Sequence, residues 1–324
     1  MEATHEGERG AGLGPAGGRT AARQLRETTV STYRSDERAA SGLRELVEVV
    51  TDVWHSRELL QQLTLRDIRI RYKQAVMGFG WAIFMPLLVV GAGLLIRFSM
   101  AQVSGGTLQN DAVAGMAVKA LAWSFFVGAI GFATPSLIGS QGLVTKVYFP
   151  REILPLSTIV AQAFDSAIGA VALALLLPFL GAVLTPQLLW LPLLVVLLVL
   201  FTSAAGLLLS CGNLFFRDVK YIVQVLLTFG IFLTPVFTEP QMLGPVGARV
   251  LMLNPLSPLL EGMRLTVAEG HNLLHPLIVT SVKGQEILAW TPWDLVYSGV
   301  WAVLGLAVSA FIFRRAAMAF AEYV

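Results

Sequence analysis

The sequence predicts an all-α polytopic membrane protein with six transmembrane helices. Hydrophobic residues make up 55% of its 324 residues and charged residues only 14%, whereas soluble domains carry about 25% charged residues. Its apolar runs approach or exceed the roughly 20 residues that a helix needs to cross hydrocarbon, and none alternates as the strands of a membrane barrel do. A soluble fold is therefore excluded. The predicted spans cover residues 77–96, 121–138, 156–180, 188–209, 219–237 and 295–313.

Positively charged residues gather at alternate ends of these spans and predict their orientation. A Lys and Arg bias marks the cytoplasmic side of membrane proteins, and the loops 101–111 and 181–187 contain neither residue. The residues that mark the cytoplasmic side are Arg66, Arg69, Arg71, Lys73, Lys146, Arg151, Arg217, Lys220, Arg314 and Arg315. We therefore predict a multi-pass protein of the cytoplasmic membrane with both termini in the cytoplasm.

The chain before the first span divides into two predicted parts. Residues 1–41 are rich in Gly, Ala, Arg, Glu and Thr without hydrophobic periodicity, so they cannot bury enough apolar surface to offset the entropy of ordering. We predict a disordered cytoplasmic tail there, without the apolar core of a secretory signal. Residues 42–76 include a basic, amphipathic helical pattern that is typical of the cytoplasmic membrane interface. Simple anchoring by positive charge is the alternative.

Three of the charged residues inside or beside the predicted spans of the domain 77–324 need a separate interpretation. Asp165 falls within the third span, where an isolated acid is costly and is by default a functional candidate. If that span begins later, Asp165 instead faces an aqueous vestibule or a cytoplasmic partner. Arg97 and Lys119 flank the first external loop, and we expect both to extend their charged ends to the outer headgroups.

The long segment 238–294 predicts an outer re-entrant element rather than an ordinary loop. Its apolar stretch 249–264 is interrupted by prolines and is too broken to span, whereas short apolar segments can enter the bilayer and return. His271 and His275 follow at helical spacing, but two histidines without a third ligand predict no metal site. We expect them on the polar outer surface.

Two short cytoplasmic loops carry residues that are typical of protein interfaces. In the insert 143–156, Pro150 suits the first turn of the third span and Glu152 the positive end of that helix. Aromatic and Arg side chains are over-represented at interface hot spots. The first loop offers Lys146, Tyr148, Phe149, Pro150, Arg151 and Glu152, and the second loop offers Arg217 and Asp218. Anchoring at the lipid interface is the alternative for both loops.

No G-x-x-x-x-G-K-[ST] phosphate loop occurs in the chain, so it is not expected to hydrolyse ATP by that device. Four blocks in order along the chain resemble the permease subunit of ABC-type polysaccharide exporters, a family that includes O-antigen, capsule and wall teichoic acid exporters. These blocks are RDIRIRYKQAVMGFGWAIFMPLL at 66–88, LVTKVYFPREILPLS at 143–157, NLFFRDVKYIVQVLLTFGIFLTPVF at 213–237 and NPLSPLLEGMR at 254–264. The resemblance extends from residue 59 to residue 324 and leaves out the tail.

This resemblance implies a homodimer that pairs with two copies of a separate ABC ATPase and moves a lipid-linked polysaccharide to the outer leaflet. ATP and Mg would bind to the ATPase, while this chain would carry no cofactor, no metal and no catalytic residue, and would contact membrane lipid but no nucleic acid. By the same resemblance, residues 146–152 would form a coupling helix on the ATPase, and 251–260 and 273–279 would be re-entrant helices. The gate helix at substrate entry would include Arg66, Asp67, Arg69, Arg71, Tyr72 and Lys73.

Aromatic rings are candidates for contacts with the glycan, because their faces suit the apolar faces of sugars. The candidates for the glycan path are Trp81, Trp123, Phe125, Phe126, Phe232 and, as a charged residue, Asp165. Packing against lipid or within the protein core is the alternative for each ring. A permease of the same architecture that exports a drug or a simple lipid remains the second hypothesis, and a membrane scaffold or enzyme without a motor is the third.

Overall fold

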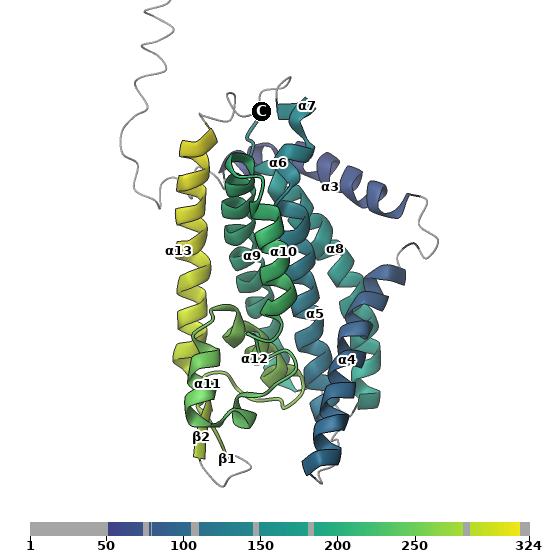
Figure 1. Ribbon diagram of the computed structural model, residues 1–324, viewed down its shortest axis with the longest axis vertical. Helices are drawn as coiled ribbons and strands as arrows, with labels where there is room; N and C mark the ends of the chain where they lie inside the picture. Colours follow the sequence, from purple (N-terminus) through teal and green to yellow (C-terminus); the bar gives the residue numbers. More distant parts are fainter. Residues whose placement is uncertain are drawn as a thin grey trace, which may run out of the picture. The chain divides into compact units, whose positions relative to one another are not determined.

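The computed structural model describes residues 51–73, 78, 80–104, 110–144, 149–180, 185–280 and 286–317. They form a largely helical fold (Figure 1). The helices are α3 (Arg57–Tyr72), α4 (Gly80–Ser104), α5 (Asn110–Ala133), α6 (Ser136–Gly139), α7 (Gln141–Val144), α8 (Ile153–Leu176), α9 (Trp190–Phe215), α10 (Val219–Gly230), α11 (Gly244–Met252), α12 (Leu256–Val267) and α13 (Pro292–Ala317). Short 3-10 helices are η1 (Leu177–Leu180), η2 (Pro186–Leu189) and η3 (Pro240–Met242), and an antiparallel hairpin joins β1 (Leu277–Thr280) to β2 (Glu286–Trp290). The predicted tail at 1–41 lies outside the described residues.

Four helices among the described residues are long and apolar enough to cross a membrane. They cover Ala112–Ala133, Ile153–Leu180, Pro186–Phe215 and Pro292–Ala317. Shorter apolar helices occur at Gly80–Ile96 within α4 and at Val219–Gly230, which is α10. The helical membrane fold predicted from composition is therefore confirmed in its main character, while the number of six spans stays a prediction.

Prolines and β-branched residues place several boundaries differently from the predicted ones. Helix α5 begins at Asn110, well before the predicted span, and ends before Thr134 and Pro135, because proline disfavours helical backbone at the residue before it. The predicted helix at 273–279 is wrong. There the chain passes through turns into β1 after Pro276, since a run of Ile, Val and Thr favours a strand.

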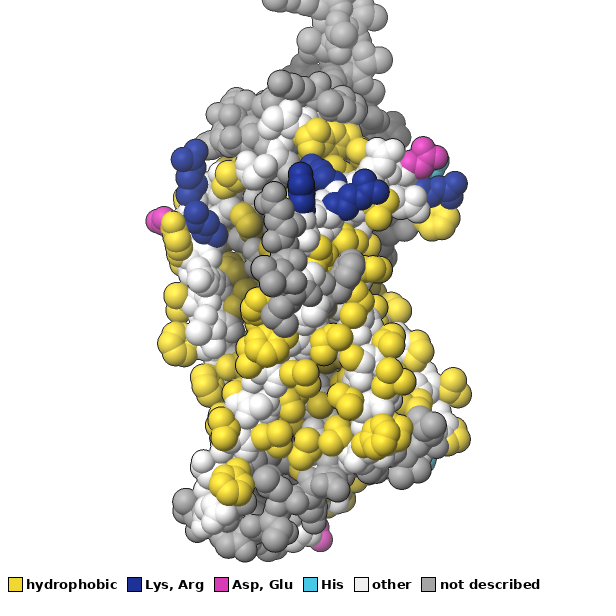
Figure 2. Space-filling model, turned by 90° about the vertical axis from the view of Figure 1, so that its right-hand side faces the viewer, with side chains coloured by type: hydrophobic (Ala, Val, Ile, Leu, Met, Phe, Trp, Pro, Cys, Tyr) yellow, Lys and Arg dark blue, Asp and Glu magenta, His cyan; other side chains and the backbone are white. Residues whose placement is uncertain are grey.

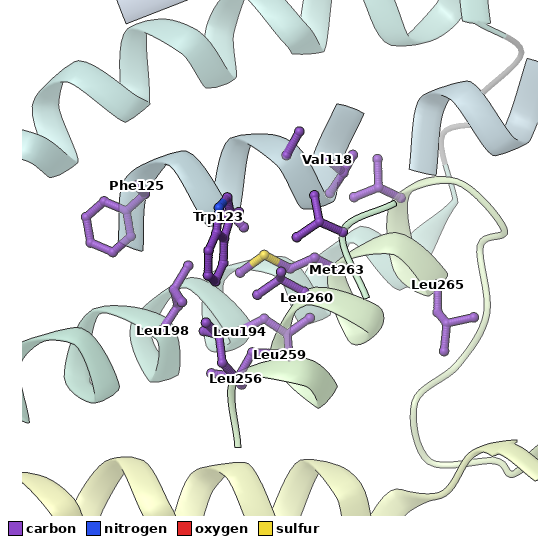
Figure 3. Close-up of a cluster of buried hydrophobic side chains, with 14 of the residues drawn as sticks. Val118, Trp123, Phe125, Leu194, Leu198, Leu256, Leu259, Leu260, Met263 and Leu265 are labelled. Atoms are coloured by element: carbon purple, nitrogen blue, oxygen red, sulfur yellow. The ribbon is translucent and has the colours of Figure 1, made fainter. Parts of the chain in front are cut away.

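The main core lies where α5, α9 and α12 meet (Figure 3). Trp123 and Phe125 of α5, Leu198 of α9, and Leu260 and Met263 of α12 are all buried there. Close packing requires one small residue in particular, because a Cβ added to Gly206 of α9 would lie 2.8 Å from the Ile159 side chain of α8 and 3.3 Å from Ala133 of α5. This core fixes α12 against the long helices even though α12 is too short to span.

Helix α3, together with α6 and α7, lies at one end of the helical body, and α11, α12 and the hairpin lie at the other end (Figure 1). A second buried cluster packs beneath α3. It contains Leu63, Leu137, Ile153, Leu154, Leu207, Cys211, Leu214 and Phe313. The connections that the sequence predicts to be cytoplasmic therefore gather at the α3 end.

Candidate functional site

Helix α3 packs along α8 through a row of polar contacts. Leu63 and Thr64 are its buried residues, and the Thr64 hydroxyl donates to the backbone oxygen of Ser157 at 3.5 Å. The Ser157 hydroxyl in turn donates to Oδ2 of Asp67 at 3.2 Å, while Oδ1 of Asp67 accepts from the Arg66 guanidinium at 2.9 Å. The inner face of the amphipathic helix is therefore bound to α8 and does not lie free at the surface.

The C-terminal end of α3 is held by Asp165 of α8. Nη1 of Arg71 lies 2.7 Å from Oδ2 of Asp165, and the Tyr72 hydroxyl donates to Oδ1 at 2.7 Å. The same Arg71 donates to Oε1 of Gln162 at 2.8 Å and to the backbone oxygen of Thr158 at 3.4 Å. We call Arg71, Tyr72 and Asp165 the α3 anchor.

The α3 anchor is screened from solvent. The side chains of Arg71 and Asp165 are 13% and 10% exposed, and the Arg71 guanidinium carbon lies 3.8 Å from the centroid of the Phe132 ring, a cation–π contact. Burial and the Asp165 carboxylate raise the pKa of the Tyr72 phenol, so this hydroxyl stays a hydrogen-bond donor. The isolated acid singled out in the sequence therefore has partners within the chain, and a role for it in transport stays a prediction.

The outer face of α3 carries the remaining gate-helix candidates. Arg69, Lys73, Leu65 and Ile70 are exposed. Seen from the side on which α3 and α4 lie, hydrophobic side chains cover much of the surface and Lys and Arg side chains group near one end (Figure 2). Apolar side chains beside cations are the arrangement that suits a helix at an anionic membrane interface.

The first predicted coupling loop is partly described. Lys146 and Tyr148 lie outside the described residues, and Phe149 packs against the cluster beneath α3. Pro150 begins the turn that leads into α8, because its carbonyl oxygen accepts from the Ile153 amide at 3.2 Å. The loop therefore joins the core directly before the helix starts.

Arg151 and Glu152 both contact the end of α13. Nη1 of Arg151 donates to the backbone oxygen of Ala317 at 2.8 Å, and Oε1 of Glu152 lies 3.6 Å from Nε of Arg314. Arg314 also pairs with Asp52 at 2.6 Å. Contact of Arg151 and Glu152 with an ATPase stays a prediction, and reversing either charge would also disturb these contacts within the chain.

Replacing Glu152 with Gln is expected to raise the melting temperature at neutral pH. Burial raises the pKa of this carboxyl, and Arg314 and Arg151 only partly oppose the effect, so the folded protein favours the protonated form over its ionised form more than the unfolded chain does. The stability contributed by that proton is present below the ordinary pKa and is lost as the pH rises through the raised value. The difference in melting temperature between Glu152→Gln and the unchanged protein should therefore become smaller as the pH is lowered from about 7.5 to about 4.5.

Thermal unfolding of the purified protein in detergent over this pH range measures the effect. Glu286→Gln serves as the control, because Glu286 is an exposed acid on β2 and should change the melting temperature little at any pH. An advantage of Glu152→Gln that stays constant with pH would contradict the assignment.

The second predicted coupling loop presents its side chains outward. Phe216, Arg217 and Asp218 are all exposed. The loop is nevertheless fixed at its base, because the amide of Lys220 donates to Oδ1 of the buried Asn213 at 3.2 Å. An exposed aromatic ring beside a cation on a fixed turn is typical of a protein interface.

A cavity of about 590 Å³ lies between α5 and α10. Its α5 wall includes the ring of Trp123, and its α10 wall includes Tyr221, Gln224 and Thr228. Trp123 lies close to α10, because a Cβ added to Gly230 would be 3.0 Å from its ring. The cavity therefore combines an aromatic surface with amide and hydroxyl groups, which is the chemistry that a sugar chain requires.

The other aromatic candidates do not gather around that cavity. Phe125 lines a separate apolar cavity of about 530 Å³ between α5, α8 and α9. Phe126 packs between Trp123 and Phe201, with ring centroids 5.8 and 6.1 Å away. Trp81 and Phe232 are exposed, Phe232 to 65%. Trp123 is thus the one predicted ring, among those described, that faces the mixed cavity.

One expectation about the opposite end is wrong. Lys119 does not extend to the headgroups, because α5 begins early enough to place it inside the helix and its side chain is fully buried beside Glu261. His271 and His275 do not share a helix; the ring of His271 instead lies 3.0 Å from the backbone oxygen of His275. Within the described ranges no group of three His, Cys, Asp or Glu side chains could hold a metal ion.

These features define a helical integral membrane protein with a polar-lined cavity between helices and a docked amphipathic helix at one end. Residues 58–267 match the membrane family of ABC-2 type transporters, which covers more than half of the chain. The chain belongs to this family.

Curated relatives are similar over most of their own length. The O-antigen export system permease protein RfbA of Myxococcus xanthus is 29% identical over 76% of this chain and 94% of its own. Two proteins of the same name from Klebsiella pneumoniae are each 25% identical, one over 64% of this chain and 79% of its own, the other over 66% and 81%. The resemblance to permease subunits of polysaccharide exporters is therefore confirmed.

Proposed function

We propose that this chain is the permease subunit of an ATP-driven exporter that moves a lipid-linked cell-envelope polysaccharide across the cytoplasmic membrane. The observation that carries the proposal is the likeness to O-antigen export permeases along nearly the whole length of one relative. In this proposal α4 and α10 are two further spans, so that six helices cross the membrane and both termini lie in the cytoplasm. The chain supplies no catalytic residue, and a separate ATPase subunit binds ATP and Mg.

The cavity between α5 and α10 is the proposed contact region for the glycan. A sugar polymer needs hydroxyl and amide partners and flat apolar surfaces, and Trp123, Gln224 and Thr228 offer these together. Val225, Leu226 and Phe229 on α10 are exposed, and we propose that a second copy of the chain covers them. The glycan would then pass between two copies, each contributing one such wall.

The α3 end is the proposed cytoplasmic side, where the ATPase docks. The segments at this end carry most of the basic residues near the span ends, and the positive-inside rule assigns such segments to the cytoplasm. The loop at Phe216, Arg217 and Asp218 is exposed. Arg217 is the sharper probe of coupling, because Arg151 and Glu152 have contacts with α13. Coupling through this loop would transmit ATPase movement to α9 and α10.

Depletion of the chain, with the proposed ATPase partner left in place, tests the proposed function. Surface polysaccharide should disappear, and lipid-linked polymer should accumulate inside the cell. Complementation with the unchanged chain should reverse both effects. Unchanged surface glycan without internal accumulation would overturn the proposal.

A coupling test follows from the exposed second loop. Arg217→Glu is expected to reduce capture of the ATPase by the purified permease about tenfold, as loss of an interface hot spot would. Arg249→Glu is the matched control, because Arg249 is an exposed cation on α11 at the opposite end. Equal capture by both variants would remove Arg217 from the interface.

Export of a drug or a simple lipid is the second candidate, and the apolar cavity favours it. The cavity of about 530 Å³ between α5, α8 and α9 is lined mainly by Ala, Leu and Val side chains, which suit a hydrocarbon chain better than a sugar. Under this alternative, depletion would leave the surface glycan unchanged, and a lipid or drug would accumulate in its place.

A further inference from the structure

A network of charged side chains is buried at the end of the fold opposite α3. Lys119 of α5 and Glu261 of α12 have fully buried side chains, and Arg264 of α12 is 4% exposed. Glu269, just beyond α12, pairs with Arg264 and is partly exposed. We call these four residues the buried charge network.

Distances within the network show how it connects the elements. Nε of Arg264 donates to Oε1 of Glu261 at 2.8 Å, and its Nη1 lies 2.5 Å from Oε1 of Glu269. Nζ of Lys119 lies 3.6 Å from Oε2 of Glu261 and donates to the backbone oxygen of Thr238 at 3.0 Å. Lys119 thus joins α5 both to α12 and to the segment that follows α10.

The backbone of α5 is adapted to the same contact. Gly115 lies one helical turn before Lys119, and residues four apart share a helix face. A Cβ added to Gly115 would lie 2.7 Å from Cγ of Arg264, so the absence of a side chain lets the aliphatic part of Arg264 lie against α5. One face of α5 therefore provides both space and charge for α12.

Breaking this contact would be costly. An ion taken out of water is stabilised only by its partners, and removal of one partner leaves an uncompensated buried charge. If α12 separated from α5, Lys119 would lose its contact with the Glu261 carboxylate, whereas Glu261 would keep Arg264 of its own helix. The physical consequence is that α5 and α12 are expected to stay together.

We propose that Lys119 and Glu261 are positioning residues that fix α12 on α5, so that the two helices move as one body during transport. Met263 and Val267 of α12 line the apolar cavity together with Val118 and Phe125 of α5, so the position of α12 sets the shape of that wall. The functional part of this inference rests on the proposed export activity, whereas the structural part does not.

Amide hydrogen exchange and export of the assembled transporter test the inference. Lys119→Met is expected to raise exchange in residues 256–268 at least tenfold while α9 and α13 keep their protection, and to lower export. Lys119→Arg retains the charge and should restore most of both properties. A folded Lys119→Met protein with unchanged exchange in α12 would overturn the proposal.

A reversible crosslink separates positioning from general stability. In a Cys211→Ala background, Gly115→Cys and Ala268→Cys can form a disulfide between α5 and the C-terminal end of α12, because the Cβ positions lie 3.7 Å apart. Ala204→Cys and Gly305→Cys provide a matched crosslink between α9 and α13, with Cβ positions 3.6 Å apart. The reduced form of each pair is its own reference, which also accounts for any shift of Arg264 caused by the new side chain.

The 115–268 crosslink, but not the 204–305 crosslink, is expected to restore low exchange and export to Lys119→Met. If Lys119→Met fails to accumulate in the membrane, the 115–268 crosslink, but not the 204–305 crosslink, is expected to restore its accumulation. Equal rescue by both crosslinks would show that the network only stabilises the protein in general, and it would overturn the positioning role. A native chain that stops exporting when crosslinked at 115–268, and resumes after reduction, would show that α12 must leave α5.

These outcomes are distinguishable from failure of the proposed function. If the unchanged chain exports no polysaccharide, the export hypothesis fails, while the exchange measurements still report whether Lys119 holds α12.

Discussion

Asp165→Ala is expected to destabilise the protein by about 3 kcal/mol and to release the C-terminal end of α3. The substitution removes the acceptor for Arg71 and Tyr72 at once. It leaves the Arg71 cation largely buried beside the neutral acceptors Gln162 and Thr158, and a buried charge that has lost its charged partner is the costly outcome. Thermal or denaturant unfolding in detergent measures the loss of stability, and trypsin cleavage within α3 measures its release.

A double-mutant cycle identifies the pair as the cause. Arg71→Met combined with Asp165→Ala should cost less than the sum of the two single changes, with a coupling of about 1–3 kcal/mol. Arg69→Met is the matched control, because Arg69 is an exposed cation on the same helix and should change stability by less than about 0.5 kcal/mol. Additive single changes would show that Arg71 and Asp165 do not stabilise each other.

The apolar pattern predicts most of the long helices because lipid imposes a length and a polarity on every span. Helices α8, α9 and α13 lie where apolar runs were identified. The early start of α5 could not be predicted, since Lys119 interrupts the hydropathy signal, and its partners, among them Glu261 at 142 positions later in the sequence, are not adjacent to it in the chain. In a hydropathy pattern, a charged residue inside a helix therefore looks like the end of a span.

The α3 anchor illustrates how residue identity and residue pairing differ. The sequence singles out Asp165 as an unusual acid and places Arg71 and Tyr72 on an amphipathic helix. The sequence does not show that these residues are partners. Arg71 is 94 positions and Tyr72 is 93 positions from Asp165, and they meet it only through the packing of α3 on α8. Arg151 and Glu152 show the reverse, since residues read as outward-facing by composition have partners on α13 in the folded chain.

The signal that could have revealed the buried charge network is the spacing within NPLSPLLEGMR. Glu261 and Arg264 are three residues apart on one helix, and such a pair in an otherwise apolar segment indicates burial with mutual compensation. Lys119, a third charge in a separate apolar run, lies beside the second carboxylate oxygen of Glu261.

Trp290→Ala is expected to be the most damaging single change outside the charged contacts, with a loss of about 3–5 kcal/mol. Trp290 of β2 is fully buried, and its indole Nε1 donates to the backbone oxygen of Leu273 at 2.9 Å. Its ring also lies against α12, because a Cβ added to Gly262 would be 3.2 Å from it. Truncation therefore opens a cavity between the hairpin and α12 and leaves a buried carbonyl oxygen without its donor.

A graded series separates these two contributions. Trp290→Phe keeps part of the ring volume but loses the N–H donor, so it should lower the free energy of unfolding by less than Trp290→Ala does. The unpaired buried acceptor contributes about 1–3 kcal/mol of this loss, and the lost ring atoms add to it. Leu288→Ala is the control, because Leu288 is an exposed residue of the same strand. The free energies of unfolding should rank Leu288→Ala, Trp290→Phe and Trp290→Ala in order of increasing loss. Equal losses for the two strand residues would mean that the hairpin does not pack on α12 through Trp290.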